Sequence, residues 1–255
     1  KRFTLEEIAP TFATSLKVKY VSKDFDAIII ADNNALTFFH DQRDTLFKDV
    51  PAVFCGINDY TDDMLKNDSL LTGVAEKTNS LGTLKLMQKI FPERQKIVVI
   101  VDTTVTGEAE YQRFKRYSKE IEGLDFETWM DYSPDKIIQG LSRLDDNCMV
   151  LSIIYLQSSD GSYVNFSSYL EMISKESPVP VFALWDFYFQ KENAAFGGDI
   201  VSASDQGQLA AQMAKQIIEG VSVKDIPVIK GNTSIPVIDY RQLTKFRIAK
   251  GAIPK

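Results

Sequence analysis

Polar side chains follow two short apolar runs near the start of the chain. Asp32 and Asn33 come directly after the run 27–31, and Asn58 and Asp59 come after the run 50–57. Small and polar residues at the end of a buried strand are typical of the place where α/β sheets bind ligands. We therefore expect these four side chains to offer donors and acceptors to a small molecule at one rim. Asn and Asp also begin turns and cap helices, so a purely structural role is the alternative.

A second group of polar side chains follows the apolar run 96–101. Asp102, Thr104 and Thr106 stand between this predicted strand and a predicted helix. Backbone amides at the start of a helix favour an anion or a carboxylate, so we expect these residues to contact a ligand. The alternative is that they only cap the helix. No Gly-Lys-Ser/Thr follows and the chain has no Gly-x-Gly-x-x-Gly, which removes the main support for nucleotide hydrolysis.

Aromatic side chains end two later strands. Trp185 and Asp186 follow the strand predicted over 179–184, and Tyr155 ends the strand predicted over 148–155. A flat ring beside a carboxylate suits a ligand that is apolar at one end and cationic at the other. We expect all three residues to contact the ligand. Packing between two lobes is the alternative for Trp185.

The residue types for catalysis are scarce, and we expect no catalytic residue, no metal and no cofactor. His40 is the only histidine, so the usual zinc site cannot form, and we expect a satisfied surface side chain. No Gly-x-Ser-x-Gly motif occurs. Cys55 and Cys148 lie far apart in sequence, and we expect two buried thiols rather than a disulfide.

Composition indicates an ordinary globular protein. The 255 residues are 44% hydrophobic and 25% charged, enough for one large core or two small ones. The formal net charge of −6 argues against nucleic-acid binding, which needs a basic face. The apolar runs are far shorter than the roughly 20 residues that a membrane-spanning helix requires.

Strand and helix patterns alternate through most of the chain. Long apolar strands that lie next to helical patterns indicate parallel sheets covered on both faces. Because ligand-type residues gather in two separate stretches, we expect two α/β lobes, each a doubly wound parallel sheet, with a ligand cleft between them. The predicted strands are 26–31, 51–55, 72–76, 96–101, 125–130, 148–155 and 179–184. The predicted helices are 4–20, with Thr4 and Glu7 as a capping box, and 33–40, 80–91, 108–122, 134–144, 163–174, 205–219 and 241–246.

The order of several segments resembles the ABC-transporter substrate-binding-protein-like family, and it resembles most the branch that serves as extracytoplasmic sensor domains. No single motif is diagnostic, but the order covers nearly the whole chain. The segments are 26–30 (DAIII), 50–59 (VPAVFCGIND), 71–74 (LTGV), 92–101 (PERQKIVVIV), 181–186 (VFALWD), 197–198 (GG) and 204–211 (SDQGQLAA).

The resemblance implies a type I periplasmic-binding-protein fold without catalysis. It implies a first lobe of residues 1–75 plus 194–222, lacking an upstream strand, helix and strand, and a second lobe of residues 76–193 plus 223–255. It also implies an extracytoplasmic protein that is tethered to the membrane by a segment outside this sequence.

The implied function is a sensor domain that closes on a small ligand, such as an amino acid or a similar zwitterion. The implied partner is a membrane-anchored histidine kinase or diguanylate cyclase module of the same protein, and a homodimer is compatible with it. The first alternative is a free substrate-binding lipoprotein that feeds an ABC permease. The second is a transferase enzyme with an α/β fold.

Overall fold

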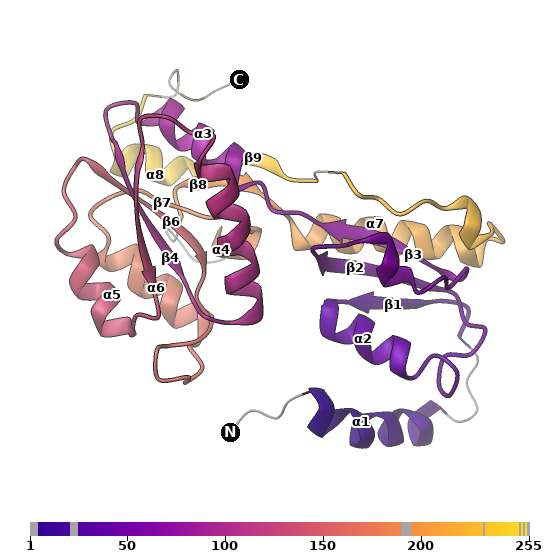
Figure 1. Ribbon diagram of the computed structural model, residues 1–255. Helices are drawn as coiled ribbons and strands as arrows, with labels where there is room; N and C mark the ends of the chain where they lie inside the picture. The colour runs from indigo at the N-terminus through magenta and orange to yellow at the C-terminus, as the bar shows by residue number, and fades with distance from the viewer. Residues whose placement is uncertain are drawn as a thin grey trace. The chain divides into compact units, whose positions relative to one another are not determined.

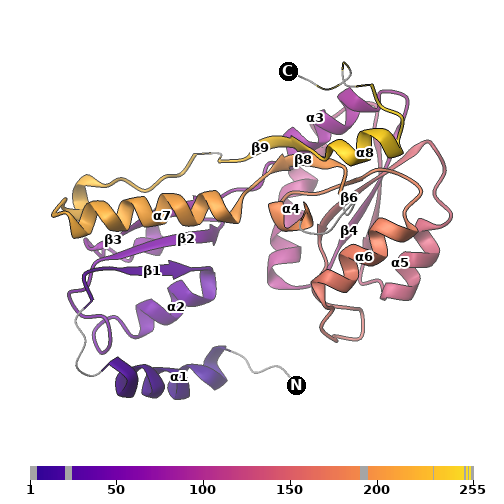
Figure 2. The same ribbon diagram turned by 180° about the vertical axis from the view of Figure 1, so that it is seen from behind.

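The computed structural model describes residues 5–20, 25–189, 195–231, 233–249, 251 and 253. The chain forms two compact units, unit 1 (Lys1–Lys77 and Ala203–Thr233) and unit 2 (Thr78–Ser202 and Ser234–Lys255). It therefore passes from one unit to the other three times. Figures 1 and 2 show that each unit has its own sheet and its own helices, so the expected pair of α/β lobes is confirmed.

Unit 1 is built on a parallel sheet in the order β1-β2-β3. Helix α2 covers one face of this sheet and helix α7 covers the other (Figure 1). Side chains alternate between the two faces along β2: Phe54 packs on the α2 side, whereas Val53 packs on the α7 side. The elements are α1 (Leu5–Tyr20), β1 (Ile28–Ala31), α2 (Asn33–Asp41), β2 (Ala52–Asn58), β3 (Leu71–Glu76) and α7 (Ala203–Ile218), with 3-10 turns at Asp62–Leu65 and Val223–Asp225.

Strand β1 is an edge strand of the unit 1 sheet. Ile28 and Asp32 donate their backbone N–H groups to Pro51 and Cys55 beside β2. The alternation along a strand therefore turns the backbone groups of Ile29 away from β2, toward the side of β1 on which the described residues place no strand. The side chain of Ile29 is 50% exposed. Both α2 and α7 contact β1, as predicted for a sheet covered on both faces, but the cover is incomplete over Ile29.

Unit 2 is built on a sheet in the order β5-β4-β6-β7-β8-β9, parallel except for the antiparallel pair β8 and β9. Helices α3 and α4 cover one face, and α5 and α6 cover the other (Figure 2). Buried side chains of β4 and β6 fill both layers. The elements are α3 (Ser80–Ile90), β4 (Lys96–Val101), α4 (Val105–Ser118), β5 (Asp125–Met130), α5 (Pro134–Leu141), β6 (Cys148–Ile154), α6 (Phe166–Glu176), β7 (Val181–Phe182), β8 (Gly197–Ile200), β9 (Ile235–Ile238) and α8 (Tyr240–Lys245), with a 3-10 turn at Asp186–Phe189.

The division of the chain into units differs in detail from the expected lobes. Strand β8 belongs to unit 2 because it pairs with β7 and β9, whereas residues 194–222 were expected in the first lobe. Residues after 222 remain in unit 1 up to Thr233. There Ile226 packs with Val53, and Ile229 bridges Val74. Thr4, the predicted cap of the first helix, lies outside the described residues.

Candidate ligand-binding site

Polar residues that follow the first two predicted strands come together in unit 1, at the carboxyl ends of β1 and β2. The Asn33 side chain makes two hydrogen bonds to the backbone of Asn58. Its Oδ1 accepts from Asn58 N at 2.9 Å, and its Nδ2 donates to Asn58 O at 3.2 Å. These bonds fix the orientation of the Asn33 amide and join the two strand ends. We call the group Asp32, Asn33, Gly56, Asn58 and Gln206 the unit 1 rim.

Asp32 holds an unusual backbone conformation in this rim. Its φ is 81° and its ψ is 153° while it caps α2 by accepting a hydrogen bond from Asn34 N at 3.4 Å. This region of conformational space is favourable for glycine almost alone, and occupying it costs another residue about 1–3 kcal/mol. Strain of this kind clusters at functional sites. Asp59, at the end of β2, also has a positive φ of 52°, and both side chains are exposed.

Gln206 and Glu76 also lie at the carboxyl ends of the unit 1 strands, although neither is among the residues predicted from the sequence. Gln206 Oε1 accepts a hydrogen bond from Gly56 N at 3.0 Å. A Cβ added to Gly56 would lie 3.7 Å from Asp32 N and 4.0 Å from Glu76 Oε2, so these groups surround Gly56. Gln206 lies in the first turns of α7, and no local pattern separates it from an ordinary helical glutamine.

In unit 2, Asp102 holds the ends of β4 and β6 together. Its Oδ1 accepts from Thr104 N at 3.1 Å and from Thr104 Oγ1 at 2.6 Å, and its Oδ2 accepts from Leu156 N at 2.7 Å and Gln157 N at 3.2 Å. Only 1% of the residue is exposed. Both carboxylate oxygens therefore bind protein groups, and the structure favours a structural role for Asp102.

Thr104 is the N-cap of α4, as the structural alternative predicts. Its Oγ1 accepts a hydrogen bond from Gly107 N at 3.1 Å. Thr106 lies in the first turn of the same helix and is partly exposed. Of the three residues predicted here, Thr106 is the one whose side chain has no hydrogen bond within the cap itself.

Tyr155 and Trp185, the two aromatic residues predicted to contact the ligand, are buried in unit 2. Tyr155 is 1% exposed and donates from its hydroxyl to Tyr132 O at 2.7 Å. Trp185 is 4% exposed and stacks on Phe187, with a ring separation of 5.7 Å. These contacts favour packing for both rings. Asp186 is partly exposed at the start of a 3-10 turn, where its backbone N–H donates to Val201 O at 3.0 Å.

The family of this chain follows from a comparison with models of known protein families. The model of the ABC transporter substrate binding proteins matches residues 13–250. The chain belongs to this family. Family members bind a small ligand and do not transform it, so the prediction that the chain is not an enzyme is confirmed. A comparison with curated protein sequences finds no match.

Solved structures of substrate-binding proteins share the fold of this family member. A ligand-free, open substrate-binding protein with adhesive properties from Clostridium difficile has a TM-score of 0.68 at 18% identity, over 95% of this chain and 80% of that one. An ABC domain from Streptococcus pneumoniae in complex with L-Trp has a TM-score of 0.62 at 17% identity, over 99% and 81%. A solute-binding protein from Agrobacterium vitis bound with α-D-tagatopyranose has a TM-score of 0.57 at 16% identity, over 99% and 86%.

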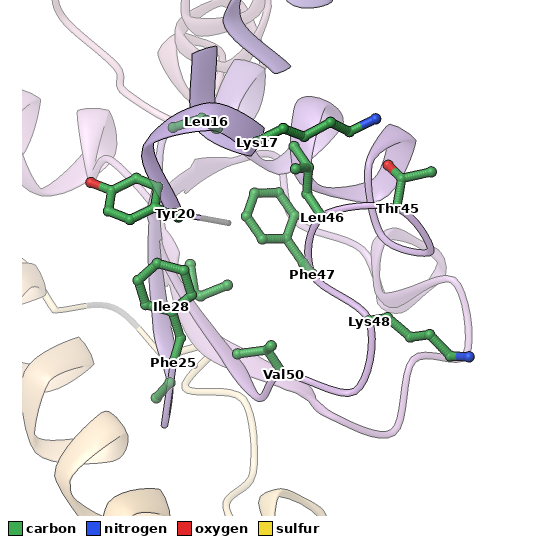
Figure 3. A pocket seen from close by; sticks show the side chains of 11 residues that line it. Leu16, Lys17, Tyr20, Phe25, Ile28, Thr45, Leu46, Phe47, Lys48 and Val50 are labelled. Carbon is green, nitrogen blue, oxygen red and sulfur yellow. The ribbon is translucent and has the colours of Figure 1, made fainter. Parts of the chain in front are cut away.

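A cavity lies elsewhere in unit 1 of this substrate-binding protein. It has a volume of about 750 Å³ and lies between α1, the amino end of β1 and residues 45–50. Figure 3 shows rings of Tyr20, Phe25 and Phe47 along it, while Lys17 and Lys48 extend away from these rings. None of the ten predicted site residues lines this cavity. It lies at the amino ends of the strands, whereas the unit 1 rim lies at their carboxyl ends.

The side chains that could bind a metal have ordinary structural surroundings in the described residues. Among the residues that the structure describes, no three His, Cys, Asp or Glu side chains are grouped to hold a metal ion. His40 is satisfied by Met64 O at 2.8 Å, as expected, although its ring is half-buried rather than on the surface. Cys55 and Cys148 are free and buried, and burial raises the pKa of both thiols. No helix within the described ranges is long and apolar enough to cross a membrane.

Proposed function

We propose that this family member is the substrate-binding component of an ABC importer, working outside the cytoplasm, and that it binds an amino acid or a similar zwitterion. The family match over residues 13–250 carries the first part of the proposal. A sensor domain attached to a kinase or cyclase is the finer prediction from the sequence. No specific observation favours it, so it stays a prediction, as do a membrane tether and a homodimer.

Carboxylates at the carboxyl ends of the unit 1 strands support the choice of a zwitterion. Asp32, Asp59 and Glu76 end the three strands of unit 1, so three carboxylates stand at one edge of the sheet. Opposite charges within a few ångströms attract, and a primary ammonium group carries three donors for such acceptors. A ligand with an ammonium group fits this edge better than a neutral sugar does, although carboxylates also bind sugar hydroxyls.

In unit 2 we propose that Thr106 and Asp186 contact the ligand and that Asp102, Thr104, Tyr155 and Trp185 position them. The support is exposure: the first two side chains are accessible, whereas Asp102, Tyr155 and Trp185 are buried. In unit 1 we propose direct contacts for Asp32, Asn33, Asn58 and Asp59.

A thermal-shift panel tests the proposal. The purified chain is melted with each of the twenty L-amino acids and, separately, with D-tagatose, D-galactose and myo-inositol, because a ligand that binds only the folded state raises the melting temperature. We expect a rise with one or a few amino acids and none with the sugars. Asp32→Asn should reduce that rise. A response to sugars alone would replace the zwitterion by a sugar, and no response at all would count against the proposed function.

A further inference from the structure

The orientation of the Gln206 side-chain amide is fixed by its surroundings. Gly56 N–H points at Gln206 and needs an acceptor, which only Oε1 can supply. Exchanging the amide oxygen and nitrogen would place two donors against each other. The donor group of Gln206, Nε2, is therefore directed away from Gly56.

Nε2 of Gln206 is a buried donor without a hydrogen-bond partner. The residue is 2% exposed, so bulk solvent does not reach this donor. Leaving a buried donor unsatisfied is unfavourable, and a buried group of this kind calls for an explanation. A ligand that supplies an acceptor when it binds is one such explanation.

A second unpartnered atom belongs to the same rim. Asn58 Oδ1 is buried and has no hydrogen-bond partner, and Asn58 lies two residues beyond Gly56 on β2. The unit 1 rim thus holds one unused donor and one unused acceptor, and it also contains Asp32, whose backbone nitrogen lies near Gly56. Gln206 also lies within the first turns of α7, where the positive end of the helix dipole favours negative charge.

We infer that Gln206 is a ligand-binding residue of unit 1, and that its Nε2 donates a hydrogen bond to a carboxylate oxygen of the solute. This inference rests on the proposed function and adds a residue to it. In this arrangement the ammonium group of the same solute binds Asp32 and Asn58 Oδ1. Because Nε2 is closed to solvent, the side chains that cover it must move apart when the solute enters.

Gln206→Glu is the sharpest test of the inference. The substitution keeps an acceptor for Gly56 N–H and replaces the Nε2 donor by a second, negatively charged acceptor. In calorimetry with the amino acid that gives the largest thermal shift, we expect Gln206→Glu to weaken binding by about tenfold to hundredfold. The matched control is Gln208→Glu in the same helix, whose side chain is exposed and bonds only to Ser204 Oγ at 3.4 Å. It should bind like the wild type.

The outcomes separate the inference from the proposed function. Wild-type affinity in Gln206→Glu would overturn the role of Gln206 and leave the proposed function intact. If Gln206→Glu does not fold, Gln206→Asn replaces it, because the shorter amide withdraws the donor without adding a charge. No binding of any amino acid by the wild type would overturn both. A spectrum with ¹⁵N labelling adds a readout that a structural role would not move, since the Gln206 NH₂ signals should shift on ligand addition.

Discussion

Asn79 Nδ2 donates a hydrogen bond to Asp199 Oδ2 at 2.7 Å, which joins two residues 120 positions apart. Asn79 also caps α3, because its Oδ1 accepts from Gly82 N at 2.9 Å. Asp199 adds a bond from its backbone N–H to Thr83 Oγ1 at 2.9 Å. Both residues lie within a few positions of a boundary between the two units, Asn79 near 77/78 and Asp199 near 202/203. The pair therefore fixes the unit 2 ends of two of the three segments that connect the units.

Removing this pair should destabilise unit 2. We expect Asn79→Ala to cost about 2–4 kcal/mol, because it removes a helix cap and leaves the Asp199 carboxylate without this donor. Both tryptophans of the chain, Trp129 and Trp185, lie in unit 2, so urea unfolding followed by tryptophan fluorescence reports on that unit. Asn165→Ala removes an exposed cap and should cost only about 1 kcal/mol. Equal losses for the two variants would contradict this account.

The contact between Asn79 and Asp199 leaves no room for a side chain at position 82. A Cβ at this position would lie 2.2 Å from Asp199 Oδ2 and 2.5 Å from Asn79 Nδ2. Gly82→Ala should therefore destabilise the protein by about 1–3 kcal/mol, as overpacking does. Gly207→Ala is the control, since nothing lies within 4 Å of its added Cβ on α7, and it should stabilise the protein by up to about 1 kcal/mol. Circular dichroism during urea unfolding measures both changes.

A buried ion pair holds the first connection between the units, at 77/78, on its unit 2 side. Arg113 pairs with Glu110 on α4, and both contact the Thr78 hydroxyl, which follows the 77/78 boundary. Arg113→Met leaves a buried carboxylate without this cation and should cost about 3–5 kcal/mol. The double variant Glu110→Gln with Arg113→Met should recover part of that loss. If the double variant is less stable than Arg113→Met, unpaired charge is not the cause.

His40 should make stability depend on pH near neutrality. Burial lowers the pKa of this imidazole below its ordinary value, the hydrogen bond to Met64 O partly opposes the shift, and Lys66 adds to it. Because the unfolded state then binds the proton more readily, stability is full above about pH 6.5 and falls as pH decreases through the folded-state pKa. The free energy of unfolding, measured by urea titrations between pH 8 and 5, should fall by at most about 1.4 kcal/mol per pH unit. His40→Gln should flatten this part of the profile, because the chain has one histidine.

The strained backbone of Asp32 predicts a conflict between stability and binding. Asp32→Gly relieves a conformation that costs about 1–3 kcal/mol, less a few tenths for the lost cap, so the variant should be more stable by about 1 kcal/mol. It should also bind the solute more weakly, since a carboxylate is lost. Denaturation and calorimetry on one preparation measure both. A variant that loses stability would show that the backbone there is relaxed in solution.

The elements that the sequence defined well are those with a single dominant pattern. The strands predicted over 96–101 and 125–130 match β4 and β5 residue for residue. The helix predicted over 108–122 begins earlier, at Val105, because Thr104 caps it. The strand predicted over 179–184 shrinks to Val181–Phe182, since its later residues form only scattered bonds to 197–201.

The candidate site was harder to predict than the fold. Asn33 and Asn58 meet as expected because neighbouring parallel strands end at one rim. Asp102 and Trp185 occupy the predicted strand ends, but the type of a residue does not reveal whether its side chain turns outward or into the core. Gln206 was missed because its role depends on Gly56, which is 150 residues away in the chain.

Within the described residues β1 has a neighbouring strand on one side only, and this affects how the 255-residue chain behaves in a test tube. An edge strand with a half-exposed Ile29, and with no charge or proline in Ile28–Ala31, is of the kind on which separate molecules stack into insoluble β-rich material. A lysine in place of Ile29 is a practical way to keep concentrated samples clear, because an outward charge on an edge strand discourages such stacking.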